Sequence, residues 1–134
     1  MFTTFNKKIS SESKLYNKIM FFSRNKFLYK EIGLSDTFNV RIVLIFFHLA
    51  FLLIKLKSTK NINESNQYSQ RIFDHAFKKI EENLREHGYG DVTVNKNMKN
   101  LVKIFYNILL DCEKYLLFSF ENKIDFLDKY LNFK

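Results

Sequence analysis

Proline is absent from the 134 residues of this chain, and glycine occurs only three times. Both residues are common in the tight turns between short strands, so their scarcity disfavours a many-stranded sandwich or barrel. The single cysteine excludes an internal disulfide and favours a reducing compartment. Tryptophan is also absent, whereas sixteen phenylalanines predict a core filled mainly by Phe, Leu and Ile. The composition therefore favours a few long helices with short connections.

The longest apolar stretch of the chain runs from Phe38 to Leu56. Only uncharged side chains lie between Arg41 and Lys55, and at about 1.5 Å per residue this part of a helix spans about 20 Å. The hydrocarbon core of a bilayer is roughly 30 Å thick, so we expect a buried central helix rather than a membrane span. Asp36 and Thr37 provide a good N-terminal signal for it.

One polar stripe interrupts this apolar helix. Arg41, His48 and Lys55 recur at intervals of seven, which keeps them on nearly one line of a helix. The stripe is interpreted either as a solvent-facing edge or as a contact line for a partner or an anionic membrane surface. His48 itself has apolar neighbours one turn away, which is typical of an imidazole at the boundary of a core.

The remaining segments also have helical spacing, and we expect an all-α fold: a single compact domain of about five to six helices around the central one. Residues 1–10 are expected to form a flexible N-terminus without a secretory signal peptide, and residues 11–134 the helical domain. Further helices are expected at 66–87 and 96–118, with Tyr89 to Val94 a shaped loop and Ser58 to Ser65 a connection. The apolar positions expected in the first and last helices are Leu15, Ile19, Phe22, Phe120, Ile124, Leu127 and Leu131.

Positive charge is concentrated in the first half of the chain. Residues 1–60 hold eleven Lys and Arg against three acidic residues, a net of +8, whereas residues 61–134 hold eleven of each sign. Such asymmetry is expected for a surface that meets lipid head groups or RNA, and an ordinary solvated basic face is the alternative.

Catalytic and metal-binding patterns were sought among the reactive side chains. The histidines and Cys112 have no zinc-site spacing, and Cys112 lies on the apolar face of its segment, where a thiol is usually inert. The glycines at 88 and 90 follow a helix rather than a strand and lack a Lys-Ser/Thr ending, so a nucleotide loop is not expected. A tight turn in which Asp91 binds backbone amides is the preferred interpretation. We therefore expect no enzymatic activity, metal, cofactor or small-molecule substrate.

Two strings of residues are more specific than the composition. The order of Phe27, Tyr29, Arg41 and His48, followed by the string Leu84 to Asp91 (LREHGYGD) and the pair Phe105-Tyr106, resembles the bacterial branch of the ubiquinol-cytochrome c chaperone family. The resemblance extends over roughly residues 15 to 133.

This resemblance implies a non-enzymatic assembly factor for ubiquinol-cytochrome c reductase, complex III of the respiratory chain. The implied partners are newly made cytochrome b or another complex III subunit, a small partner protein, the ribosome and an anionic membrane surface. The implied location is cytoplasmic, peripheral to the inner membrane. A basic helical module that binds nucleic acid or the ribosome remains the alternative, and a purely structural subunit is a third option.

The resemblance also suggests where a client would be held. Arg41, His48 and Phe51, on the exposed edge of the central helix, are the expected client-binding residues. The expected structural turn motif consists of Leu84, Arg85, Glu86, Gly88, Gly90 and Asp91. For the charged side chains of this motif, a local ion-pair network is the alternative to a role in binding.

Overall fold

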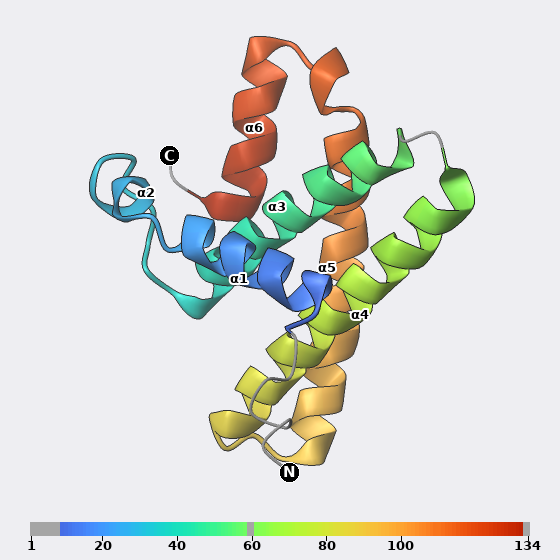
Figure 1. The fold of residues 1–134 in the computed structure, drawn as a ribbon. Helices are drawn as coiled ribbons and strands as arrows, with labels where there is room; N and C mark the ends of the chain where they lie inside the picture. Colours follow the sequence, from blue (N-terminus) through green and yellow to red (C-terminus); the bar gives the residue numbers. More distant parts are fainter. Residues whose placement is uncertain (1–8, 59–60, 133–134) are drawn as a thin grey trace.

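The computed structural model describes residues 9–58 and 61–132, and within these ranges it contains helices and no strands. This confirms the predicted all-α fold. The elements in chain order are α1 (Ser11–Ser23), α2 (Lys26–Lys30), α3 (Phe38–Lys57), α4 (Ile62–Glu86), α5 (Asp91–Glu113), the 3₁₀ turn η2 (Tyr115–Leu117) and α6 (Phe120–Leu131). Figure 1 shows α1, α4, α5 and α6 arranged around α3. Most of the predicted flexible N-terminus, residues 1–8, lies outside the described residues.

The central position predicted for Phe38 to Leu56 is confirmed by α3. Thr37 caps the helix, its hydroxyl oxygen accepting a hydrogen bond from the backbone N–H of Val40 at 3.3 Å. Half of its twenty residues are buried, and the side chain of Phe46 is completely so. The helix is longer than its uncharged part, and by length and composition alone it could cross a membrane. Its apolar side chains instead form the centre of the helical core.

A cluster of phenylalanines joins α3 to α4 and α5. The ring of Phe46 stacks on that of Phe77 with centroids 5.5 Å apart and meets Phe105 edge-on at 5.3 Å. Such offset and edge-to-face arrangements are the favoured geometries of aromatic pairs. Phe47 lies on the other side of α3 and contacts Phe126 of α6 at 5.4 Å. Each long helix thereby buries its apolar stripe against α3.

The apolar face of α1 differs from the prediction. Ser10 caps this helix, but its buried side chains are Tyr16, Ile19 and Ser23, and Phe22 is 52% exposed. The predicted face (Leu15, Ile19, Phe22) and the observed face (Tyr16, Ile19, Ser23) both have three-four spacing through Ile19. Ser23 can be buried because its hydroxyl donates to the carbonyl oxygen of Ile19 at 2.8 Å. An ion pair of 2.9 Å between Glu12 and Arg71 ties α1 to α4.

Two predicted connections are shorter than expected. The predicted loop from Tyr89 to Val94 is wrong beyond Gly90, because α5 begins at Asp91 and completely buries Val94. Gly90 occupies its N-cap without a side-chain hydrogen bond. In the connection predicted at 58–65, α4 already starts at Ile62, and residues 59–60 lie outside the described residues.

The last helix, α6, buries the predicted Leu131 and also Phe126, which was not predicted. Phe120 is 77% exposed, and Phe126 takes the buried position against Phe47. The helix is held to α5 by the hydroxyl of Tyr130, which donates to Asp111 Oδ2 at 2.6 Å. Burial and this hydrogen bond to a carboxylate both raise the pKa of Tyr130.

Candidate functional site

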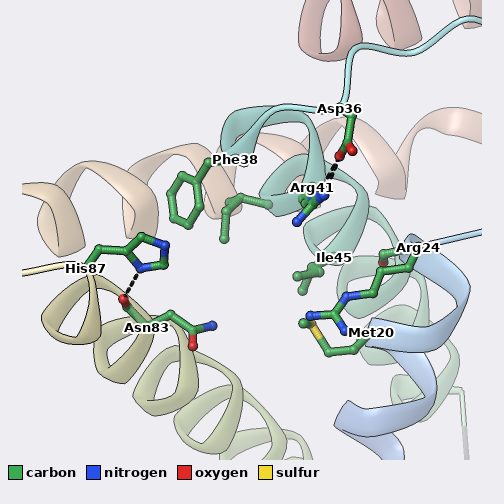
Figure 2. A pocket seen from close by; sticks show the side chains of 10 residues that line it. Met20, Arg24, Asp36, Phe38, Arg41, Ile45, Asn83 and His87 are labelled. Carbon is green, nitrogen blue, oxygen red and sulfur yellow. Dashed lines mark hydrogen bonds and ion pairs between the residues drawn. The ribbon is translucent and has the colours of Figure 1, made fainter. Parts of the chain in front are cut away.

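A cleft of about 320 Å³ opens where the end of α1, the start of α3 and the end of α4 meet (Figure 2). Arg24 and Arg41 lie on one side of it, and His87 approaches from the last turn of the α4 region. The Nδ1 atom of His87 is 2.7 Å from the carbonyl oxygen of Asn83, which fixes the ring at the helix end. The cleft therefore brings Arg41 of the polar stripe close to His87, which belongs to the segment of the turn motif.

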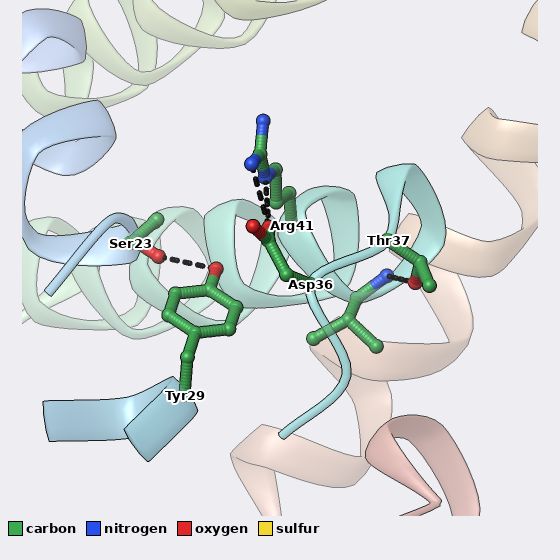
Figure 3. A network of polar contacts seen from close by, with 6 residues as sticks. Ser23, Tyr29, Asp36, Thr37 and Arg41 are labelled. Carbon is green, nitrogen blue, oxygen red and sulfur yellow. Dashed lines mark hydrogen bonds and ion pairs between the residues drawn. The ribbon is translucent and has the colours of Figure 1, made fainter. Parts of the chain in front are cut away.

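Arg41 is held at the mouth of this cleft by a carboxylate. Its Nε atom donates to Asp36 Oδ1 at 2.7 Å, and its Nη2 atom lies 2.6 Å from the same oxygen (Figure 3). About half of the Arg41 side chain is exposed, so the pair is solvated and contributes little to stability. Asp36 sits just before α3, where its charge also meets the positive end of the helix dipole. The pair orients the guanidinium while leaving part of it free to meet a partner.

His48 lies about two turns further along α3 and is half-buried. Its Nδ1 atom is 2.7 Å from the carbonyl oxygen of Leu44, and its ring stacks on Phe22 of α1, with centroids 6.2 Å apart and planes 7° from parallel. The prediction of a boundary imidazole is therefore confirmed. Phe22 is a neighbour of the predicted site that sequence reasoning missed, since it was assigned to the core of α1.

Phe51 extends the edge towards the end of α3. Its side chain is 41% exposed, and its ring meets Tyr115 of η2 edge-on at 5.6 Å. Together Phe22, His48, Phe51 and Tyr115 form what we call the aromatic ridge, which joins α1, α3 and η2. Of the three residues predicted to bind a client, Arg41 thus lies beside the cleft, and His48 and Phe51 lie within the ridge.

The predicted turn motif connects α4 to α5. Leu84 is buried in α4, and Gly88 has a φ of +86°, a left-handed conformation that favours glycine. Arg85 is paired with Glu81 of its own helix at 3.2 Å and with Asp91 at the start of α5. Asp91 therefore contacts a guanidinium, in place of the backbone amides expected for it.

The remaining motif residues are on the surface. Glu86 is exposed at the last position of α4, and Gly90 has an ordinary φ of −76° with open space where a Cβ would lie. The conformational reason for glycine thus applies at Gly88 and not at Gly90. The position of this turn, at the end of α4 that also carries His87, links it to the cleft.

The thiol of Cys112 has little access to solvent. Cys112 is 3% exposed, and burial raises the pKa of its thiol to about 12, with a smaller effect from Asp111. A thiol with so high a pKa is a poor nucleophile at neutral pH. In the described part of the chain, no three His, Cys, Asp or Glu side chains gather in a way that could hold a metal ion.

A comparison with models of protein families shows to which family the chain belongs. The model described as ubiquinol-cytochrome C chaperone matches residues 30–124, which is most of the chain. The chain belongs to the ubiquinol-cytochrome C chaperone family. The matched range is narrower than residues 15 to 133, over which the resemblance was expected. No curated protein and no solved structure matches the chain.

The range that matches the chaperone family contains most of the candidate site. It covers α3 and α4 with Arg41, His48 and Phe51, and it includes the whole of the turn motif. It leaves out α1, from which Phe22 and Arg24 reach the ridge and the cleft.

Proposed function

We propose that this chaperone is a non-enzymatic assembly factor for ubiquinol-cytochrome c reductase and binds newly made cytochrome b at the cytoplasmic face of the inner membrane. Family membership supports a chaperone role. The observation that carries the choice of client is the aromatic ridge, where Phe22 and Phe51 remain about half exposed although the chain has an adjacent core. Exposed apolar side chains in a row are what an apolar client helix requires.

The ridge and the cleft have complementary roles in this proposal. The apolar client helix lies along α3, contacting His48 and Phe51, and Arg41 at the cleft pairs with a polar or acidic group at the end of that helix. A guanidinium suits this task because it offers several donors in a fixed plane. The turn from Gly88 to Asp91 fixes the ends of α4 and α5 and so keeps the cleft open.

Further partners follow from the charge of the chain. Its net charge of +8 is carried by residues 1–60, which include α1, α2 and α3. This basic half of the chain is attracted to an anionic membrane surface. Ribosomal RNA and a small partner protein are the other proposed partners. Cytochrome b is a membrane protein, so a chaperone that holds it is expected to work at the membrane surface.

The test is recovery of cytochrome b with tagged variants from detergent-solubilised cells. Arg41→Ala and Phe51→Ala should each reduce recovery at least several-fold while the melting temperature falls by no more than about 5 °C, because both side chains are about half exposed. Lys99→Ala and Leu110→Ala are matched controls, since they remove an exposed cation and an exposed apolar side chain from α5.

Three results would count against this function. If the wild type recovered no more cytochrome b than an unrelated basic protein does, cytochrome b would not be its client. If the α5 control variants lost as much recovery of cytochrome b, the client would not be bound at Arg41 and Phe51. If the wild type instead recovered ribosomes, with a steep dependence on salt and no cytochrome b, the alternative of a nucleic-acid or ribosome-binding module would be favoured.

A further inference from the structure

A second cleft, of about 290 Å³, shares Arg24, Asp36 and Arg41 with the first. Its lining side chains are Arg24, Lys26, Tyr29, Lys30, Asp36 and Arg41. Four of these six are cationic, and the only carboxylate among them, on Asp36, is already paired with Arg41. The cleft is therefore a concentration of positive charge that no acidic side chain of its own lining fully compensates.

The backbone around this cleft is built to bring these side chains together. Asn25 begins α2 directly after α1, its side-chain oxygen accepting from the N–H of Phe27 at 3.0 Å. The hydroxyl of Tyr29 then donates to the carbonyl oxygen of Ser23 at 2.8 Å, which holds α2 against the end of α1 (Figure 3). After α2, the buried side chain of Leu34 anchors the return to α3. These contacts hold the four cationic side chains close together although they repel one another.

Apolar side chains flank the same charges. Phe21 and Phe27 are more than half exposed, and Ile32 and Phe38 nearly half. None of the residues of α2 is buried, and Figure 1 shows α2 at one side of the molecule, away from α4 and α5. Cations mixed with exposed Phe and Ile are typical of segments that lie in the interface of an anionic membrane.

We infer that this surface, from Phe21 to Arg41, docks the protein on a bilayer by binding the phosphate of an anionic phospholipid in the second cleft. Guanidinium groups match phosphate oxygens in a planar fork, and the lysines of α2 add point charges around it. The flanking Phe27 and Ile32 side chains enter the boundary between head groups and acyl chains. The inference rests on the membrane location in the proposed function and assigns that location to particular residues.

A nucleic acid would be attracted by the same cations, but the apolar flank distinguishes the two. Bases stack on aromatic faces, and an exposed isoleucine provides no such face. Ile32 can instead be buried among acyl chains, where its transfer from water is favourable. Lipid therefore uses both the cations and the exposed Ile32 of this surface, whereas RNA uses the cations and the aromatic rings only.

The experiment compares two double variants in flotation with vesicles of phosphatidylcholine, with and without phosphatidylglycerol. Lys26→Ala/Lys30→Ala removes two cations of the cleft, and Lys78→Ala/Lys99→Ala removes two exposed lysines from α4 and α5. Each variant lowers the net charge by the same amount. The α2 variant should bind anionic vesicles about 30-fold more weakly, because each lysine near the surface contributes roughly a tenfold or smaller factor. The control should stay within about threefold of the wild type.

A second variant tests the apolar flank separately from the charge. Phe27→Ala should leave the salt dependence of vesicle binding unchanged and reduce the binding that persists in high salt. Both α2 variants should keep the wild-type melting temperature, because α2 contains no buried residue. Both should also recover cytochrome b normally from detergent extracts, where no bilayer is present, and this separates the inference from the proposed function.

Each competing outcome would overturn the inference. Equal losses in both double variants would mean that bulk charge, and not this surface, attracts the membrane. Saturable binding of inorganic phosphate without any preference for anionic vesicles would mean a soluble ligand. Loss of ribosomal RNA binding in Lys26→Ala/Lys30→Ala, with unchanged vesicle binding, would assign the surface to nucleic acid.

Discussion

Replacing Phe46 by alanine tests whether the aromatic contacts between α3, α4 and α5 are the centre of the core. The side chain is 0% exposed and contacts the rings of Phe77 and Phe105. Large-to-small changes at buried phenylalanines cost about 3 to 5 kcal/mol, and the loss of two aromatic pairs favours the upper part of that range. We therefore expect the free energy of unfolding to fall by about 4 kcal/mol.

The expected change in melting temperature follows from the size of the chain. An unfolding entropy of about 2.1 cal/mol/K per residue gives roughly 280 cal/mol/K for the whole protein, so about 4 kcal/mol corresponds to roughly 14 °C. Urea unfolding followed by far-ultraviolet circular dichroism suits a chain without tryptophan. Phe51→Ala is the matched control because it removes the same ring from a 41% exposed position, and it should cost under about 1.5 kcal/mol. Similar costs for the two variants, or a loss below about 1 kcal/mol at Phe46, would refute this description of the core.

Three further predictions concern single side chains. Tyr16→Phe should leave stability unchanged or raise it by up to about 1 kcal/mol in urea unfolding, because the buried hydroxyl of Tyr16 has no hydrogen-bond partner among the described residues. Gly88→Ala should cost about 1 to 2 kcal/mol because of its φ of +86°, and Gly90→Ala clearly less. Stability should fall by up to about 1.4 kcal/mol per pH unit between about pH 9 and pH 12, because the folded Cys112 thiol has its pKa raised to about 12 and the unfolded thiol ionises first; Cys112→Ala should flatten this part of the profile.

Each of these predictions has an outcome that contradicts it. A loss above about 1 kcal/mol for Tyr16→Phe would show that the hydroxyl makes a stabilising hydrogen bond. Equal effects of alanine at the two glycines would remove the backbone argument for Gly88. An unchanged alkaline slope in Cys112→Ala would mean that other groups, such as Tyr130, cause it.

The helices themselves could be predicted because their apolar stripes are long. The stretch from Phe38 to Leu56 is too apolar to be exposed, and the many phenylalanines predict a Phe-rich core, in which Phe47 and Phe77 are buried. The start of α5 could not be predicted, because Val92 and Val94 read as short β-branched alternation. Packing decides this case, since α5 completely buries Val94 and leaves Val92 exposed.

The contacts of the candidate site could be predicted only in part, because several of them join residues from different helices. Spacing along α3 keeps Arg41 and His48 on nearly one line, and in the structure Arg41 borders the cleft whereas His48 and Phe51 contact rings of α1 and η2. The same reasoning could not find Phe22, because it depends on how α1 crosses α3. Nor could it find the pairing of Arg85 with Asp91, since the path of the turn sets this contact.

The attachment of α2 has a consequence for local motion in the folded protein. This five-residue helix is held by partly buried Leu28 and Tyr29 and by the buried Leu34 after it, whereas α3 is held by core contacts on several sides. Segments with few buried side chains open at a small fraction of the global unfolding free energy. Backbone amides of α2 should therefore exchange with solvent deuterium long before those around Phe46, through brief local openings that leave the core closed.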